Sequence, residues 1–155
     1  MNKQEFLDIL EEHKELGFQE QIDYEKFYLY SIVTHSTAIE GSTMTEVENQ
    51  LLFDEGLSAK GKSIFEQNMN LDLKAAYERS MEMARENTPF SIDMLKELSS
   101  IVMRRTGGIF NAPGGVFDSS KGDLRRVNVT AGTMGKSYMS YLKVPQKLEI
   151  FCKEM

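Results

Sequence analysis

Residues Thr34–Gly56 read THSTAIEGSTMTEVENQLLFDEG, and this stretch contains the end of one predicted helix and the whole of the next. Upstream of it, apolar or small residues recur every three or four positions from residue 24 to residue 39, which is typical of a helix with one buried stripe. Gly41 can adopt the left-handed conformation that ends such a helix. Thr45 and Glu48 have the spacing of a capping box, which predicts a second helix from Glu46 to Glu55 that stops at Gly56.

Two longer helices are predicted downstream. The third runs from Ser63 to Glu86, and its expected inward residues are Met69, Leu73, Ala76, Tyr77, Ser80 and Met83 or Ala84. The fourth follows the sequence NTPFS, and its expected inward residues are Met94, Leu95, Leu98, Ile101 and Val102. The sequence therefore predicts a mainly α fold in which residues 22–56 and 63–103 form two helical segments.

The remainder of the chain has a different composition. Residues 104–126 begin with RRTGGIFNAPGGVFDSSKGD, whose five glycines and one proline predict an irregular basic connection. In residues 127–143, β-branched and aromatic residues flank a glycine-bearing middle, which predicts a β-hairpin. Pro145 is expected to open a further helix over residues 145–155, with Leu148 and Phe151 or Cys152 on its inner face.

Composition limits the classes of protein to consider. The chain has 155 residues, of which 41% are hydrophobic and 27% are charged, which predicts one soluble domain. No apolar run approaches the roughly 20 residues of a membrane helix, and acidic residues interrupt the N-terminus, so we expect a cytoplasmic protein without a signal peptide. One cysteine and two histidines provide neither an internal disulfide nor a metal site.

The net charge of −6 is unevenly distributed. Residues 104–147 contain eight Lys or Arg and two Asp, so this window carries +6 and the remainder −12. The acidic whole argues against nonspecific binding of nucleic acid. The basic window either meets phosphates or an acidic partner, or is a solvated face; the sequence leaves both interpretations open.

One short motif in this part of the chain is similar to a nucleotide-binding sequence. Residues 130–137, TAGTMGKS, are similar to the phosphate-binding loop G-x-x-x-x-G-K-S, but Thr130 stands where the motif has its first glycine. A phosphate loop must also open a helix, whereas the residues that follow alternate like a strand. We therefore predict a hairpin here.

Ser36 and Glu40 lie four residues apart and so share one face of the first helix. Because Ile32 and Ile39 are assigned to the same face, we expect the Glu40 carboxylate to be partly buried at a helix C-terminus, where the helix dipole is unfavourable and a cation or an arginine is needed. The alternative is that Glu40 extends into solvent at a fraying helix end. The residues alone leave both readings open.

Ser36, Glu40 and Gly41 fit the pattern [ST]-x-x-x-E-[GN], which resembles the inhibitory helix of Fic-family proteins. Three further stretches are similar to this family in the same order. Residues 89–103, PFSIDMLKELSSIVM, resemble the helix before the Fic core. Residues 122–132, GDLRRVNVTAG, resemble its basic turn and flap. Residues 141–155, YLKVPQKLEIFCKEM, resemble the helix that follows the flap. The resemblance spans residues 24–155.

The resemblance implies a Fic-like helical bundle with a flap hairpin, and a protein adenylyltransferase that uses ATP and Mg²⁺ to transfer AMP to a Ser, Thr or Tyr hydroxyl of a target protein. In that family the motif H-x-F-x-[DE]-G-N-G-R-x-x-R supplies the catalytic base and the phosphate-binding groups. Neither His13 nor His35 begins such a motif. We therefore expect a chain truncated before the catalytic helices, with no catalytic residue of its own, and His35 to be a residue of the inhibitory helix.

The same resemblance implies roles for the residues that are present. Glu40 would pair with the second arginine of the motif and act as a brake, while Ser36 would steady the helix, contact the nucleotide, or simply pack at a helix crossing. The flap would bind a segment of the target as an added strand, or it is an ordinary hairpin that covers the core. The expected docking residues are Val127, Asn128, Val129, Thr130, Tyr138 and Tyr141. Arg125 and Arg126 either attract an anionic ligand or are solvated.

Three hypotheses follow for the function. The chain is the regulatory and target-docking part of an adenylyltransferase, a stand-alone inhibitory or protein-interaction module that acts on a separate catalytic partner, or a basic-faced helical binding domain unrelated to AMP transfer. The first is favoured because a flap has no use in an inhibitor alone and because the last helix lacks a stop signal. The apolar letters LEIFC of that helix leave open a contact with a second copy of the chain.

Overall fold

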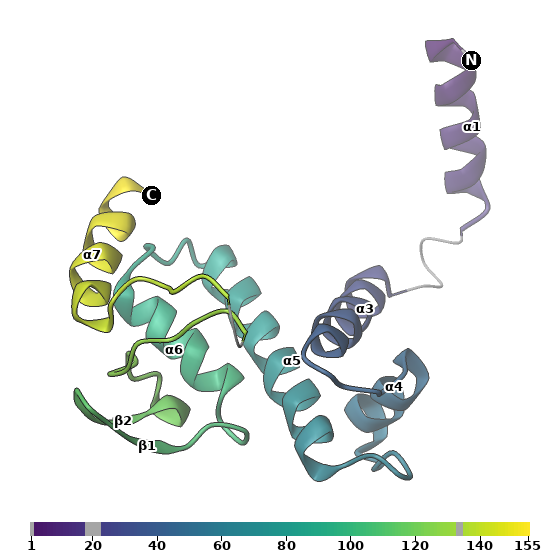
Figure 1. Cartoon of the computed structure of the whole chain (residues 1–155). Helices are drawn as coiled ribbons and strands as arrows, with labels where there is room; N and C mark the ends of the chain where they lie inside the picture. Colours follow the sequence, from purple (N-terminus) through teal and green to yellow (C-terminus); the bar gives the residue numbers. More distant parts are fainter. Residues whose placement is uncertain (1, 18–22, 133–134) are drawn as a thin grey trace.

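The computed structural model describes residues 2–17, 23–132 and 135–155, and it is mainly helical (Figure 1). Its α-helices are α1 (Lys3–Glu15), α3 (Tyr24–Ile39), α4 (Glu46–Glu55), α5 (Ile64–Arg85), α6 (Ile92–Val102) and α7 (Val144–Glu154). Two strands, β1 (Ile109–Ala112) and β2 (Gly115–Asp118), form an antiparallel hairpin, and two 3₁₀ turns are η1 (Ser119–Lys121) and η2 (Tyr141–Lys143). The predicted fold class, mainly α with one β-hairpin, is confirmed.

The helix ends follow the local signals in the sequence. Gly41 has φ 96° and Gly56 has φ 69°, so both adopt the left-handed conformation that favours glycine. The Thr45–Glu48 capping box is present, with the Thr45 side chain accepting from the backbone of Glu48 and the reverse bond also formed. Pro145 lies in the first turn of α7. These local signals set where α3 and α4 end and where α4 and α7 begin.

Helix α5 is the central element of the fold. It contacts α3, α4 and α6, while α6 in turn contacts η1 and α7. Figure 1 shows α5 between the pair α3 and α4 and the part of the chain that carries α6, the hairpin and α7. Helix α1 stands apart from the other helices, and it has no buried residue.

Among the described residues, slightly more polar than apolar side chains are buried. Its buried apolar residues are Val33, Met44, Leu52, Ala76, Met83 and Ile101. Buried polar residues come mainly from α3, α4 and α5, and they are Thr34, Thr37, Ser42, Asn49, Gln67, Asn70 and Asp72.

On α5, the predictions for Ala76 and Met83 are confirmed, and Ala84 is exposed. The other expected inward residues of that helix are half-buried, because the positions facing α3 and α4 are taken by polar residues. On α6, Ile101 is buried and the other four expected residues are half-buried.

The prediction of an irregular connection over residues 104–126 is wrong. These residues contain the β-hairpin, in which Phe110 pairs with Phe117 and Ala112 pairs with Gly115. The pairing leaves a loop of two residues, Pro113 and Gly114, and the rings of Phe110 and Phe117 stack with centroids 5.2 Å apart. Cross-strand aromatic pairs of this kind stabilise a hairpin, and two apolar pairs around a Pro-Gly-Gly turn were the signal for it.

The predicted hairpin at residues 127–143 forms only in part. In its described residues the two arms run antiparallel with one isolated bridge, between Thr130 and Ser137, and the second arm ends in the 3₁₀ turn η2. Residues 133 and 134, at its tip, lie outside the described residues. We refer to residues 127–141 as the flap loop.

No helix in the described part of the chain is both long and apolar enough to cross a membrane.

Candidate functional site

The candidate site begins at the C-terminal end of α3. Glu40 is the residue that caps this helix, and its backbone N–H donates to the carbonyl of Thr37 at 3.1 Å. The Glu40 side chain is exposed, as are Ile32 and Ile39, so the expectation that it is partly buried is wrong. It forms no hydrogen bond or ion pair with any described residue. Ser36 lies one turn earlier and is half-buried, and its hydroxyl likewise has no partner within the described ranges. The end of α3 therefore presents a carboxylate and a hydroxyl that are not used in holding the fold together.

A buried hydrogen-bond network fixes this helix end. Thr37 Oγ1 donates to Asn70 Oδ1 at 2.7 Å, and Asn49 Nδ2 donates to the same oxygen at 2.9 Å. Asn70 Nδ2 donates to Ser42 Oγ at 3.1 Å, and Asn49 Nδ2 also reaches Thr34 Oγ1 at 2.8 Å. Asn49 and Asn70 are completely buried. Because α3, α4, α5 and the chain after Gly41 all contribute, the position of Glu40 is set by contacts between four segments.

The chain that follows Gly41 is held by Glu66, at the start of α5. The backbone N–H and the hydroxyl of Thr43 both donate to Glu66 Oε1 at 2.9 Å. Ser63 donates to the other oxygen through its N–H at 3.0 Å and its hydroxyl at 2.8 Å. Hydrogen bonds from the backbones of Thr43 and Ser63 and from their hydroxyls lower the pKa of Glu66 from 4.5 to about 2. The ionised Glu66 thus anchors the segment directly behind Glu40.

The N-terminal half of α3 is held separately against α4. Tyr30 Oη donates to Asp54 Oδ1 at 2.6 Å, and Lys26 Nζ lies 2.7 Å from Asp54 Oδ2. Burial, together with the hydrogen bond to Asp54, raises the pKa of Tyr30. His35 lies on the exposed side of α3, with Nε2 3.7 Å from Glu46 Oε1 and 74% of its side chain accessible. His35 thus lies on this helix, as expected, while the inhibitory role of the helix stays a prediction.

The second part of the candidate site is the flap loop. Around the Thr130–Ser137 bridge, Ala131 N donates to the carbonyl of Lys136 at 3.1 Å and Tyr138 N to the carbonyl of Val129 at 3.0 Å. This is the pattern in which the two bridged residues turn their own N–H and C=O groups away from each other. The backbone of Thr130 therefore faces the outer edge of the loop. The side chains of Val129, Thr130 and Tyr138 are exposed.

Arg125 closes the flap loop at its base. Its guanidinium donates from Nη1 to the carbonyl of Val127 at 2.6 Å and from Nη2 to the carbonyl of Met139. Beside it, Tyr141 N donates to Asn128 Oδ1 at 3.1 Å. Three of the six predicted docking residues, Val127, Asn128 and Tyr141, thus lie at the base, and the other three lie on the arms. No hydrogen bond or ion pair among the described residues joins this loop to Glu40.

Part of the basic window is committed to the fold. Asp72 of α5 is completely buried, and it accepts the backbone N–H of Arg105 at 2.7 Å and the guanidinium of the same residue. Lys121 lies 3.7 Å from Asp118. By contrast, the side chains of Arg104 and Arg126 have no partner in the described parts of the chain. The window is therefore partly structural and partly available to a ligand.

The described residues of the sequence TAGTMGKS do not form a phosphate-binding loop. A phosphate loop requires backbone amides at the start of a helix, but Lys136 and Ser137 lie in the second arm of the flap loop, where Ser137 pairs with Thr130. Thr133 and Met134 of the same motif lie outside the described residues. Among the described side chains, no group of three His, Cys, Asp or Glu could hold a metal ion.

Sequence reasoning missed the residues that position Glu40. Thr37, Asn49, Asn70 and Glu66 were not predicted to matter, because apolar periodicity is blind to buried polar side chains. A signal was available for Glu66, which stands three residues after Ser63 as in a capping box. The two asparagines, 15 and 33 residues from their partners on α3, carry no local signal.

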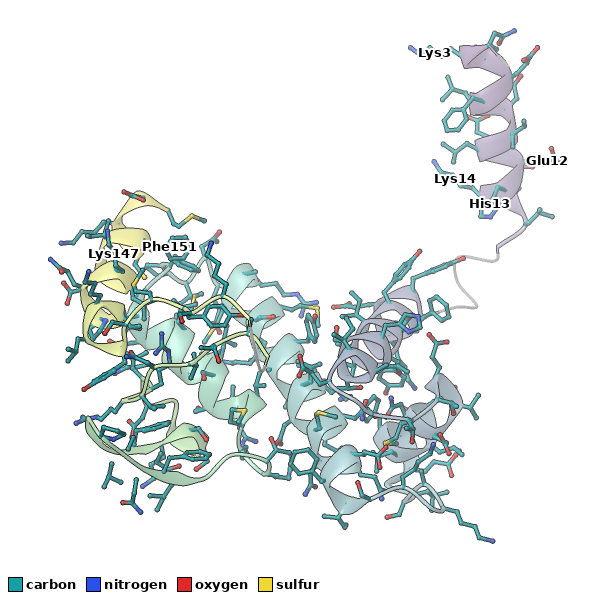
Figure 2. All side chains as sticks on the ribbon, in the orientation of Figure 1. Lys3, Glu12, His13, Lys14, Lys147 and Phe151 are labelled. Carbon is teal, nitrogen blue, oxygen red and sulfur yellow. The ribbon has the colours of Figure 1, made fainter. Side chains whose placement is uncertain are left out.

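Figure 2 shows all placed side chains, with Glu12, His13 and Lys14 at the end of α1 that is nearest the rest of the chain.

A scan of the sequence against protein-family models finds no matching family, and a search of curated proteins finds no match. The resemblance to Fic proteins stays a prediction that rests on the residues quoted above.

Proposed function

We propose that residues 24–155 are the regulatory and target-docking part of an autoinhibited protein adenylyltransferase, which transfers AMP from ATP to a Ser, Thr or Tyr hydroxyl of a target protein. The observation that carries the proposal is the unpaired carboxylate of Glu40 at a firmly held helix end. Residues 1–155 contain no H-x-F-x-[DE]-G-N-G-R-x-x-R motif, so we assign them no catalytic step and no ATP or Mg²⁺ ligand.

The surroundings of Glu40 support its role as a brake. A carboxylate at the C-terminal end of a helix is repelled by the helix dipole, so a guanidinium that reaches it gains more than it would from an ordinary exposed carboxylate. Because the buried network around Asn70 already fixes the backbone, pairing requires little ordering of the protein. Glu40 is thus suited to hold the second arginine of the catalytic motif in an unproductive position.

The outer edge of the flap loop supports the docking role. Thr130 turns its backbone N–H and C=O outward, and an extended segment can pair with such groups whatever its side chains are. Val129 and Tyr138 offer exposed apolar surface next to this edge, with 38% and 60% of each residue accessible. A target segment added here would present its hydroxyl without much demand on its sequence.

The test compares two glutamate-to-glutamine variants of the natural protein that contains this sequence. Glu40→Gln removes the charge of the proposed brake. Glu55→Gln is the matched control, because Glu55 is also an exposed glutamate at a helix end, followed by a left-handed glycine, and has no partner among the described residues. Each variant is incubated with radiolabelled ATP, and AMP incorporation into protein is measured after the intact mass has been checked.

We expect Glu40→Gln to raise AMP incorporation about tenfold or more, since a charge-assisted pair contributes about 1.5–3 kcal/mol and 1.4 kcal/mol corresponds to a factor of ten. Glu55→Gln should leave the rate unchanged. Equal rates for the two variants would show that Glu40 is not a brake. If the natural protein has no catalytic motif, the same comparison made with an added Fic partner tests the stand-alone inhibitory module.

A further inference from the structure

A pocket of about 470 Å³ lies at the base of the flap loop. It is formed by α6, the turn between β1 and β2, residues 123–126 and the segment around η2. The polar groups that line it come from Lys96, Asp123, Arg125, Arg126 and Tyr141. Three cations and one carboxylate therefore line this pocket, and they come from α6 and from residues 123–126.

The charges of this pocket are not balanced by the protein. Arg125 donates to two backbone carbonyls, which leaves its positive charge without a carboxylate partner. The side chains of Lys96 and Arg126 have no hydrogen bond or ion pair within the described residues. Asp123 accepts the backbone N–H of Asp118 at 2.9 Å. The pocket thus carries a net charge of about +2 in a chain whose net charge is −6, which attracts an anionic group.

The walls of the pocket are preformed. Gly114 N donates to the carbonyl of Arg126 at 3.2 Å, and a Cβ atom on Gly114 would lie only 2.5 Å from the ring of Tyr141. The hairpin turn is therefore packed directly against the two ends of the flap loop. On the other side, a Cβ on Gly122 would meet the carbonyl of Lys96 at 2.1 Å, so the chain before Asp123 is packed equally closely on α6. A ligand would find these groups already in place.

We propose that this pocket binds the carboxylate of an Asp or Glu side chain of the target protein. The inference rests on the docking role of the flap loop, because residues 125–126 continue directly into the edge at Thr130. Arg126 lies four residues before Thr130, which corresponds to about 13 Å of extended chain at 3.3 Å per residue. In a target strand paired with Thr130, one residue lies opposite Thr130. An acidic residue about four positions away from it along the target strand would place its side chain at the pocket.

The experiment uses the full 155-residue chain, labelled with ¹⁵N, and two synthetic peptides of twelve residues. Both peptides contain one serine in a sequence of alternating valine and threonine. One has glutamate at the fourth position from the serine, and the other has glutamine there. Binding is followed through the amide resonances of the protein at low salt, and residues 123–126 report on the pocket while residues 129–131 report on the edge.

We expect the glutamate peptide to bind about fivefold more tightly than the glutamine peptide, as for a partly exposed ion pair. The double variant Lys96→Gln with Arg126→Gln should abolish this difference. Lys147→Gln is the matched control, because Lys147 lies on α7, labelled in Figure 2, and does not line the pocket. This variant should keep the preference for glutamate.

The outcomes separate this inference from the docking role itself. Equal affinities with shifts at residues 129–131 would overturn the acidic preference and leave edge pairing intact. Absence of binding by both peptides would overturn the acidic preference and count against docking at the edge. If a single-stranded DNA oligonucleotide shifts residues 123–126 with a steep salt dependence and the glutamate peptide does not, the pocket is a nucleic-acid contact and the inference is wrong.

Discussion

Thr37 of α3 and Asn70 of α5 are joined by a 2.7 Å hydrogen bond in which the Thr37 hydroxyl donates to the Asn70 amide oxygen. Both residues are at most 2% accessible, and they are 33 positions apart in the sequence. Glu40 follows Thr37 by three residues, so this bond lies about one helical turn before the proposed brake residue. The placement of Glu40 therefore depends on a polar contact in the interior, and the stability of that contact can be measured independently of any activity.

Replacing Thr37 by valine should destabilise the protein by about 1–3 kcal/mol, because the completely buried Asn70 loses one of the two donors to its amide oxygen. Ser36→Ala is the control on the same helix, since the Ser36 hydroxyl has no partner among the described residues, and its effect should stay within about 0.5 kcal/mol. Urea unfolding followed by circular dichroism measures both. Similar effects of the two substitutions would contradict the network.

Arg105 and Asp72 should respond unequally to substitution. Arg105→Ala leaves the completely buried Asp72 carboxylate without its guanidinium, at a cost of about 3 kcal/mol. Asp72→Asn removes the buried charge itself, and the Arg105 side chain is 43% accessible and can be hydrated, so the cost should be nearer about 1 kcal/mol. Arg104→Ala is the control, because Arg104 is the preceding residue and is exposed. A reversed order would mean that the pair does not stabilise the fold in this way.

The low pKa of Glu66 predicts a pH dependence of stability. The pKa of Glu66 is about 2 in the folded state, below its ordinary value of 4.5. Ionised Glu66 therefore stabilises the fold fully above about pH 4.5. That contribution is lost as the pH falls through 4.5 toward 2. The free energy of unfolding of the wild type minus that of Glu66→Gln should therefore shrink between pH 6 and pH 2. A difference in unfolding free energy that does not change with pH would contradict the hydrogen bonds assigned to Glu66.

Gly114 and Gly108 offer a matched pair of glycines beside the hairpin. A Cβ on Gly114 would lie 2.5 Å from the Tyr141 ring and 2.7 Å from the carbonyl of Arg126, so Gly114→Ala should cost about 1–3 kcal/mol. A Cβ on Gly108 would have nothing within 4 Å, so Gly108→Ala should be neutral or stabilising by up to about 1 kcal/mol. Thermal unfolding distinguishes them. Tolerance of alanine at position 114 would show that the turn is not packed on the flap loop.

Local chemistry accounts for what could be predicted from the sequence. The capping box at Thr45, the stops at Gly41 and Gly56 and the start at Pro145 involve neighbouring residues only, and each is found where it was expected. The position of the hairpin was wrong because the five glycines of residues 104–123 were interpreted as breaks, although Gly114 lies in its turn and Gly115 begins its second strand.

The buried asparagines could not be predicted, because their partners come from other helices. Asn70 has the same local sequence context as a solvated helix residue, and only the approach of Thr37 and Asn49 makes its burial favourable. Of the candidate site, the sequence pointed to Glu40, Ser36 and the flap residues, but not to the side chains that hold them or to the pocket beside Arg126.

The two carbonyl contacts of Arg125 have a consequence for variation in this protein. Because one guanidinium contacts the carbonyls of both Val127 and Met139, the two arms of the flap loop are fastened together where the loop enters and leaves the domain. Exposed side chains on the described arms, such as Val129 and Tyr138, can therefore vary while the body of the domain stays as it is. Recognition at the edge can then diversify from one homologue to another, whereas Arg125 and its two carbonyl partners have to stay in place.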